Sequence, residues 1–220
     1  MTLYALAAGA GPNSKEGLNR AAQGIDQMRK ECSRAGDLDS LRGYVGKGGA
    51  IYFGSFYSLL PPAWGFTGRN YHPPQDAFNA LLSFGYALLQ KDVTTMAEVV
   101  GLDPYLGCFH ALEYGRPSLI LDLMEEFRPL AVDRMVLALA LDGHITPQDF
   151  SFTGRKERPV ALGDKLIPQV IAAYEAGLEV QVDHNPSGQL RFLRHCFELQ
   201  ARIYASVVVG NRREYVGLVA

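Results

Sequence analysis

The sequence predicts a mainly α-helical fold, a multi-helix domain with one short β-hairpin. Apolar residues recur at helical spacing along most of the chain, and Gly and Pro pairs interrupt that pattern at intervals of about one helix. A single stretch, residues 152–164, has the pattern of a hairpin instead. With 48% hydrophobic and 20% charged residues, the composition is that of an ordinary globular protein.

The first half of the chain predicts a flexible arm followed by three helices. Residues 1–13 are small and glycine-rich, and they predict a flexible N-terminal arm. Ser14 can cap a helix to about residue 35, and Asp39 can cap a second helix that ends before Pro61-Pro62. Asp76 opens the strongest helical segment, DAFNALLSFGYALLQK. Its apolar residues lie on nearly all sides, as expected of a helix at the centre of a core.

The second half predicts further helices on either side of the hairpin. They are expected over residues 93–100, 118–127, 129–141, 165–177 and 188–209. Pro117 suits the first turn of the second of these, because Pro lacks the N–H that a first turn leaves unused. The hairpin, FTGRKERPVALGD, turns on a basic tip. No internal repeat or long linker occurs, so residues 14–220 are expected to form one helical domain.

Charge, cysteines and hydropathy exclude several protein classes. The 21 basic and 23 acidic residues give a net charge of −2, so only a local basic face would attract nucleic acid. Cys32, Cys108 and Cys196 form no C-x-x-C pair. This argues against a disulfide framework or a cysteine zinc site, and it favours reduced thiols and a cytoplasmic location. No apolar stretch approaches the roughly 20 residues that cross a bilayer, so no membrane partner is expected.

A phosphate-binding loop is not supported. The segment Gly43–Gly49 contains a Gly-Lys pair, but a Walker A loop needs a glycine five residues before Gly46 and Ser or Thr after Lys47. Leu41 and Gly48 occupy those positions. No nucleotide cofactor-binding residue is therefore predicted.

The segment GLDPYLGCFHALEYGRPSLILDLMEEFRP, residues 101–129, carries the candidate chemistry. Asp122 and Glu125 are three residues apart and share one face of a helix, and His110 lies in the turn before it. An imidazole facing two carboxylates suits Mg²⁺ or Mn²⁺. The alternative is a structural histidine beside solvated acids. The apolar neighbours of Asp122 argue against that alternative, because a carboxylate among them needs a partner.

The same segment resembles the signature of the CRISPR-associated spacer integrase, the metal-dependent DNA endonuclease of the adaptation machinery. The resemblance continues in order through LRGYVGKGGAIYF, DAFNALLSFGYALL and FELQAR, and it covers roughly residues 14–215. Members of this family combine a small N-terminal β-rich domain with a larger helical catalytic domain. This chain begins about where the catalytic domain would, so we expect a fragment or a minimal member that lacks the β domain.

The resemblance implies the roles of the site residues. His110, Asp122 and Glu125 are the candidate catalytic residues, with His110 and Glu125 as ligands of Mg²⁺ or Mn²⁺ and Asp122 as a supporting carboxylate. The third ligand of the family is a glutamate in a motif resembling L-R-G-x-E-G, where this chain has Val45. Valine cannot coordinate a metal, so binding should be weakened. Two interpretations stay open: an inactivated site, or a third ligand recruited from elsewhere.

The family reaction is the attack of a DNA 3′-hydroxyl, or of water, on a phosphodiester, and it needs no nucleotide cofactor. The implied partners are double-stranded DNA, the small partner subunit of the adaptation complex and a second copy of the chain in a homodimer. The candidate DNA contacts are Arg42, Lys47, Arg69 and Arg116. The alternative function is a catalytically inactive DNA-binding or assembly subunit of the same complex. Whether the chain is an enzyme depends on Val45.

Overall fold

The computed structural model describes residues 12–70 and 72–219, so most of the predicted arm over residues 1–13 lies outside the described residues. The α-helices are α2 (Pro12–Cys32), α3 (Leu38–Phe56), α4 (Ala77–Val100), α5 (Ser118–Met124), α6 (Arg134–Leu141), α7 (Leu166–Leu178) and α8 (Leu193–Val208). The strands are β1 (Phe150–Arg155), β2 (Arg158–Leu162), β3 (Gln181–His184) and β4 (Gln189–Phe192). Short helical turns η1 (Pro62–Trp64), η2 (Arg128–Asp133) and η3 (Pro147–Asp149) complete the elements. The predicted mainly α fold is confirmed.

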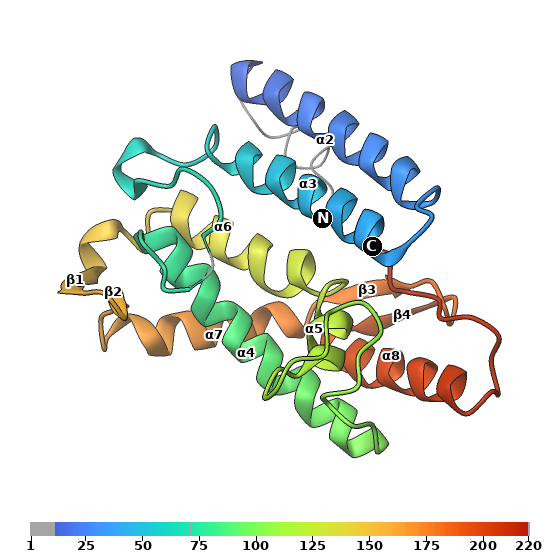
Figure 1. The fold of residues 1–220 in the computed structure, drawn as a ribbon. Helices are drawn as coiled ribbons and strands as arrows, with labels where there is room; N and C mark the ends of the chain where they lie inside the picture. The colour runs from blue at the N-terminus through green and yellow to red at the C-terminus, as the bar shows by residue number, and fades with distance from the viewer. Residues whose placement is uncertain (1–11, 71, 220) are drawn as a thin grey trace. The chain divides into compact units, whose positions relative to one another are not determined.

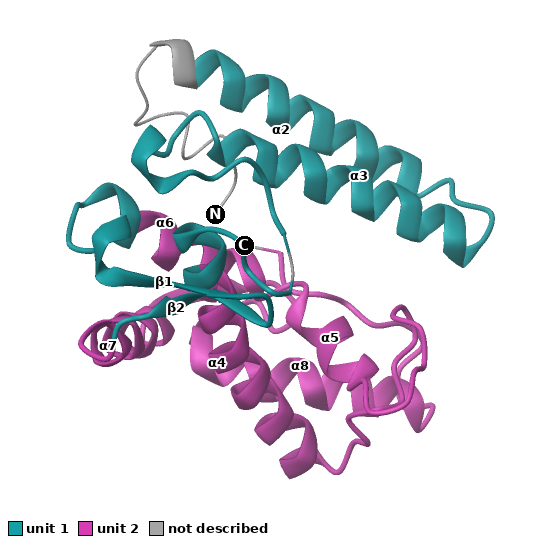
Figure 2. Cartoon of the chain, turned by 60° about the vertical axis from the view of Figure 1, so that its left-hand side comes forward, with its two compact units in different colours: residues 1–81, 139–163 teal, residues 82–138, 164–220 magenta. Residues whose placement is uncertain are grey.

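The chain forms two compact units, which Figure 2 colours separately. Unit 1 comprises residues 1–81 and 139–163, and unit 2 comprises residues 82–138 and 164–220. No helix among the described residues is both long and apolar enough to span a bilayer.

In unit 1, α2 and α3 lie side by side as a helical hairpin (Figure 1). Gly24 of α2 permits their close approach, because a Cβ there would lie 3.3 Å from the Ile51 side chain. The residue that caps α3 is Asp37 rather than the expected Asp39. Its carboxylate accepts the Ser40 backbone N–H at 2.7 Å, which holds the pKa of Asp37 below its usual value.

A cluster of aromatic side chains packs in the core of unit 1. The Phe78 ring packs edge-on against Phe56, Trp64 and Phe66, and Trp64 also contacts Phe150 at the start of β1. Strands β1 and β2 pair antiparallel, with Phe150 opposite Leu162, which confirms the predicted hairpin.

In unit 2, the structure corrects two boundaries. Residues 77–100 form one helix, α4, instead of two, because no Gly or Pro stands between the two expected helices and Leu89, Val93 and Ala97 continue one buried stripe at a spacing of four. Helix α5 ends at Met124 instead of Phe127. A π-helical turn follows at residues 128–133, where Pro129 has no N–H to continue an α-helix.

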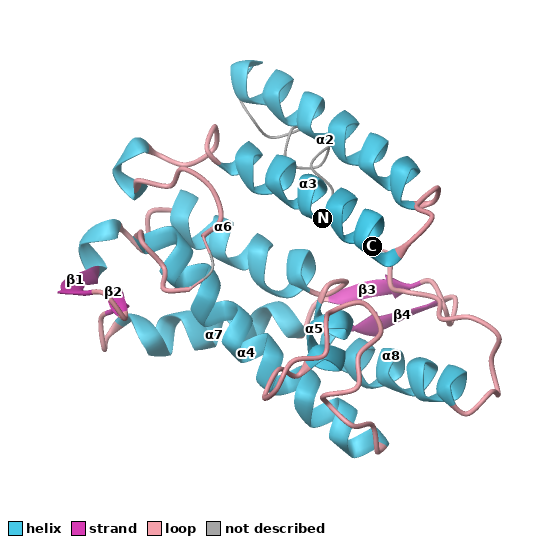
Figure 3. Cartoon of the chain, in the orientation of Figure 1, coloured by secondary structure: helices cyan, strands magenta, loops and turns pink. Residues whose placement is uncertain are grey.

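Unit 2 also contains a second hairpin, which the sequence analysis missed. Strands β3 and β4 pair antiparallel over residues 181–192, and Figure 3 shows them as a small separate sheet. The expected helix start at Gly188 was wrong, since Gly188 has a φ of +65° in the connecting turn and α8 begins at Leu193. Four-residue strands give too short an alternation to stand out from a helical pattern.

Candidate active site

The loop between α4 and α5 is fastened to the first turn of α5. The Leu119 N–H donates to the Pro104 carbonyl at 3.1 Å, and the Ser118 hydroxyl donates to the Ala111 carbonyl at 2.8 Å. Gly107 lies where the two segments meet: a Cβ there would be 2.5 Å from the Ser118 carbonyl carbon. Only a glycine can occupy this position without a backbone shift.

The Asp122 carboxylate organises the same loop. It accepts three consecutive backbone N–H groups, from Cys108 at 2.6 Å, Phe109 at 2.9 Å and His110 at 2.8 Å. Its side chain is only 12% exposed. The prediction that the apolar neighbours of Asp122 force it to find a partner is confirmed, and the partner is the loop backbone together with the His110 ring.

The His110 imidazole lies between two carboxylates. Its Nδ1 is 2.6 Å from Asp122 Oδ1, and its Nε2 is 3.8 Å from Glu125 Oε1. An ionised carboxylate only accepts hydrogen bonds, so the contact with Asp122 places the imidazole proton on Nδ1. In the neutral ring, the Nε2 lone pair is then free to face Glu125. The structure thus brings together the three residues that the sequence predicted.

This donor set fits a divalent cation in part. A bare imidazole nitrogen and a carboxylate oxygen 3.8 Å apart are closer than twice a metal–ligand bond of about 2.1 Å, so both can contact one cation. Glu125 is 42% exposed and also pairs with Arg128 at 3.4 Å. Within residues 12–70 and 72–219, no three His, Cys, Asp or Glu side chains form a complete metal-binding group.

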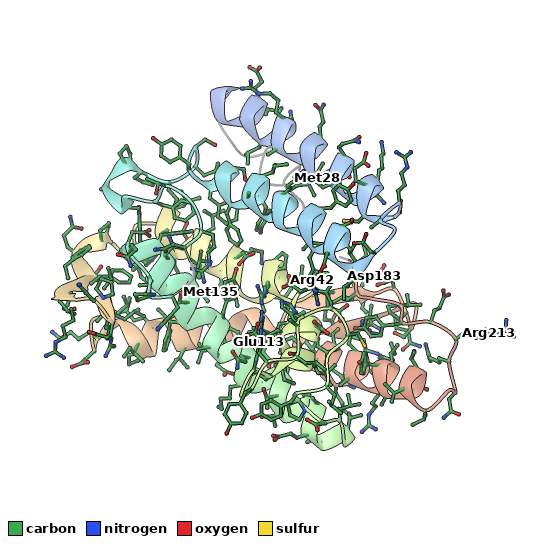
Figure 4. The ribbon with its side chains drawn as sticks, in the orientation of Figure 1. Met28, Arg42, Glu113, Met135, Asp183 and Arg213 are labelled. Atoms are coloured by element: carbon green, nitrogen blue, oxygen red, sulfur yellow. The ribbon has the colours of Figure 1, made fainter. Side chains whose placement is uncertain are left out.

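The remaining predicted site residues of the family motif lie in unit 1. Val45, Arg42 and Lys47 are on α3, and Figure 4 labels the Arg42 side chain there. Val45 is 40% exposed. Arg42 pairs with Asp39 at 3.0 Å, and the Lys47 ammonium lies over the Tyr44 ring. Because these residues and His110 belong to different units, their convergence on one site stays a prediction.

Two predicted DNA contacts have local partners. Arg69, in unit 1, donates to Asn79 Oδ1 at 2.8 Å and so helps to fix the loop before α4. Arg116, in unit 2, pairs with Glu113 at 3.1 Å, and Figure 4 labels Glu113. The Arg116 pair is between partly exposed groups and is therefore weak enough to exchange for a phosphate.

Two features around the site were not predicted from the sequence. The Cys108 thiol lies 3.1 Å from the Tyr204 hydroxyl of α8, and burial raises the pKa of that tyrosine. Glu126, the neighbour of Glu125, is partly buried, and this burial raises the pKa of its carboxyl group. The doubled acid in MEEF was the available signal, because two adjacent acids directly after a short helix with a buried face cannot both face solvent.

Comparison with known proteins assigns the family. The family model described as "CRISPR associated protein Cas1" matches residues 3–176. A "CRISPR-associated endonuclease Cas1 3" from Thermus thermophilus is 37% identical over 197 residues, which are 88% of this chain and 58% of that protein. The chain thus spans little more than half the length of this relative.

Two solved structures share the fold. A casposase bound to an integration product has a TM-score of 0.78 at 22% identity, over 91% of this chain and 58% of that one. A chain of a Cas6-RT-Cas1–Cas2 complex has a TM-score of 0.84 at 20% identity, over 99% of this chain and 23% of that one. The family match, which covers most of the chain and contains the His110, Asp122 and Glu125 cluster, leads to one conclusion: this chain belongs to the Cas1 family of CRISPR-associated proteins.

Proposed function

We propose that this chain is the helical part of a metal-dependent DNA endonuclease and integrase of CRISPR spacer acquisition. It would attack DNA phosphodiesters with a DNA 3′-hydroxyl or with water. Family membership, the endonuclease name of the Thermus relative and the integration product bound by the casposase support this proposal.

One observation carries the proposal: His110 Nδ1 lies 2.6 Å from Asp122 Oδ1 and Nε2 lies 3.8 Å from Glu125 Oε1, so a proton shared with Asp122 leaves Nε2 facing Glu125. This is the arrangement in which a carboxylate orients a metal-ligating histidine. His110 Nε2 and Glu125 Oε1 would hold Mg²⁺ or Mn²⁺, which supplies charge stabilisation at the phosphoryl oxygen. Asp122 contributes by fixing the ring and the loop that bears it.

DNA would be bound through local cations, since the net charge of −2 gives no general attraction. Arg42, Lys47 and Arg116 are the proposed phosphate contacts. Arg69 would act mainly through its bond to Asn79, by shaping the loop. The proposed partners are double-stranded DNA, a second copy of the chain and the small partner subunit of the adaptation complex. The Cas1–Cas2 complex with the same fold supports the last of these.

A second function is favoured by Val45. A hydrocarbon side chain stands where the family motif has a ligand, and two protein donors alone give a divalent cation few of its preferred oxygen ligands. The alternative is a catalytically inactive subunit that binds DNA or assists assembly.

Strand transfer and nicking of duplex DNA with Mn²⁺ distinguish the two functions. We would compare the chain with Val45→Glu, His110→Ala and, as a matched control, His144→Ala, which replaces an exposed histidine. Activity that is lost only in His110→Ala supports the endonuclease. Activity that appears only in Val45→Glu identifies an inactivated integrase. If the unsubstituted chain and Val45→Glu bind DNA with the same affinity in EDTA and neither cleaves it, the assembly function is supported and the catalytic proposal fails.

A further inference from the structure

The partly buried carboxylate of Glu126, beside the candidate ligand Glu125, anchors the segment that follows α8. We call residues 211–219 the tail segment. The Glu126 carboxylate accepts hydrogen bonds from Gln200 Nε2 of α8 at 2.9 Å, from the Tyr215 hydroxyl and from the Leu218 backbone N–H. Two of its three partners therefore belong to the tail segment, about 90 residues away along the chain.

The surrounding contacts make this arrangement specific. Gln200 is itself held by His184, whose Nε2 lies 3.1 Å from Gln200 Oε1. Asn185 donates to the Gly217 carbonyl at 3.2 Å and accepts the Val219 N–H at 2.9 Å. Gly217 passes directly over the carboxylate, since a Cβ there would lie 3.1 Å from Glu126 Oε2. The tail segment is thus fitted against Glu126 rather than loosely folded over it.

Glu125 is the residue whose position this network determines. It follows α5 directly, and the residues after it are fixed: Glu126 by the tail segment, and Phe127 by full burial against the Phe197 ring, 4.6 Å away. A carboxylate partly removed from water is costly unless its oxygens find donors, and here each oxygen of Glu126 accepts at least one hydrogen bond, so the network resists rotation of this turn. The backbone of Glu125 is part of the same turn, so the fixed turn also sets the direction of its side chain, which lies 3.8 Å from His110 Nε2.

We propose that Glu126 and the tail segment form a positioning device that keeps Glu125 turned toward His110. This inference rests on the proposed roles of His110 and Glu125. Glu126 and Tyr215 do not ligate the cation themselves. They act as outer partners of a ligand, whose loss typically weakens metal affinity by 10- to 100-fold.

Two tyrosine substitutions test the device in the full chain. Tyr215→Phe removes the hydroxyl that bonds Glu126. Tyr174→Phe is its control, because it removes another tyrosine hydroxyl in unit 2 that bonds a carboxylate, Asp92, at 3.0 Å. For each protein we would measure the urea unfolding midpoint, the Kd for Mn²⁺ alone by electron paramagnetic resonance, and the NMR signals of the Glu125 carboxyl carbon and the His110 ring nitrogens without metal.

Both substitutions are expected to lower the unfolding midpoint, but only Tyr215→Phe is expected to weaken Mn²⁺ binding, by about tenfold, and to shift the Glu125 carboxyl signal. Glu126→Gln keeps one acceptor oxygen, so its loss of Mn²⁺ affinity should lie between those of Tyr174→Phe and Tyr215→Phe. Equal Mn²⁺ affinity and unchanged Glu125 signals in Tyr215→Phe would overturn the proposal. If the unsubstituted chain binds no Mn²⁺, the metal part of the proposed function fails, and the Glu125 signal alone decides whether the device exists.

Discussion

Replacing Asp122 by Asn tests the electrostatic centre of the site with almost no change in shape. The carboxylate accepts four hydrogen bonds, three from backbone N–H groups and one from the His110 ring. An amide has one acceptor atom and one donor atom. Two of the four donors must then face an N–H₂ group: either the Cys108 and Phe109 bonds are both lost, or the His110 backbone bond is lost and the ring bond reverses its direction.

The expected loss of stability follows from those two bonds. A hydrogen bond to a charged group contributes about 1.5 to 3 kcal/mol, and the lower value applies here because the loop beside the 12% exposed carboxylate can still reach water. We therefore expect Asp122→Asn to lower the free energy of unfolding by about 1.5 to 3 kcal/mol, according to which way the amide turns. Asp183→Asn is the control: this aspartate is exposed on β3, Figure 4 labels it, and its effect should stay within about 0.5 kcal/mol.

Urea unfolding followed by circular dichroism measures the stability difference, and ¹⁵N NMR of the imidazole measures the tautomer. The unsubstituted chain should carry its His110 proton on Nδ1, whereas an amide nitrogen facing the ring would favour the proton on Nε2. If Asp122→Asn matches the control in stability and keeps the original tautomer, the carboxylate does not organise the loop and the reasoning is wrong.

Three further outcomes test the packing around the site. Gly107→Ala should destabilise the chain by about 2 kcal/mol or more, since its Cβ would meet backbone atoms at 2.5 and 2.7 Å. Gly177→Ala on α7 is the control: nothing lies within 4 Å of its Cβ, so it should stabilise the chain by up to about 1 kcal/mol. Thermal unfolding measures both changes. Phe127→Ala should cost about 3 to 5 kcal/mol, because this ring is fully buried, and denaturant titration checks it. Iodoacetamide at pH 8 should modify the exposed Cys108 and spare Cys196. Burial raises the pKa of Cys196 to about 11, so its reactive thiolate forms only as the pH approaches that value. Mass spectrometry of the peptides checks the order of reaction, and faster modification of Cys196 would contradict the prediction.

The position of the candidate site could be predicted from the sequence because its parts are close along the chain. His110, Asp122 and Glu125 lie within 16 residues, one turn and one short helix apart. Helical spacing places the two acids on one face, and the apolar residues between them force Asp122 inward. The structure added how the pair is made: three backbone N–H groups of the loop converge on that carboxylate.

Elements whose stability comes from distant contacts were harder to predict. The β3–β4 hairpin is four residues wide on each side, and its buried His184 is held by Gln200 of α8. A local pattern of that length does not distinguish a strand from the start of a helix. The break after Met124 had a visible cause in Pro129, but the π-helical turn that resolves it depends on packing.

The helical class and the grouping of His110, Asp122 and Glu125 follow from residue type and near spacing along the chain, whereas the expectation of a glutamate at Val45 comes from the family resemblance. Which acid contacts the His110 ring directly, and what surrounds the other acid, depends on the folded chain. Asp122 accepts hydrogen bonds from the loop backbone, and Glu125 is the acid that faces His110 Nε2. Glu126 accepts hydrogen bonds from Tyr215 and Leu218, which follow α8 and lie about 90 positions further along the chain. No local sequence rule pairs residues that far apart. The pairing arises because a carboxylate partly removed from water must find its donors within the fold.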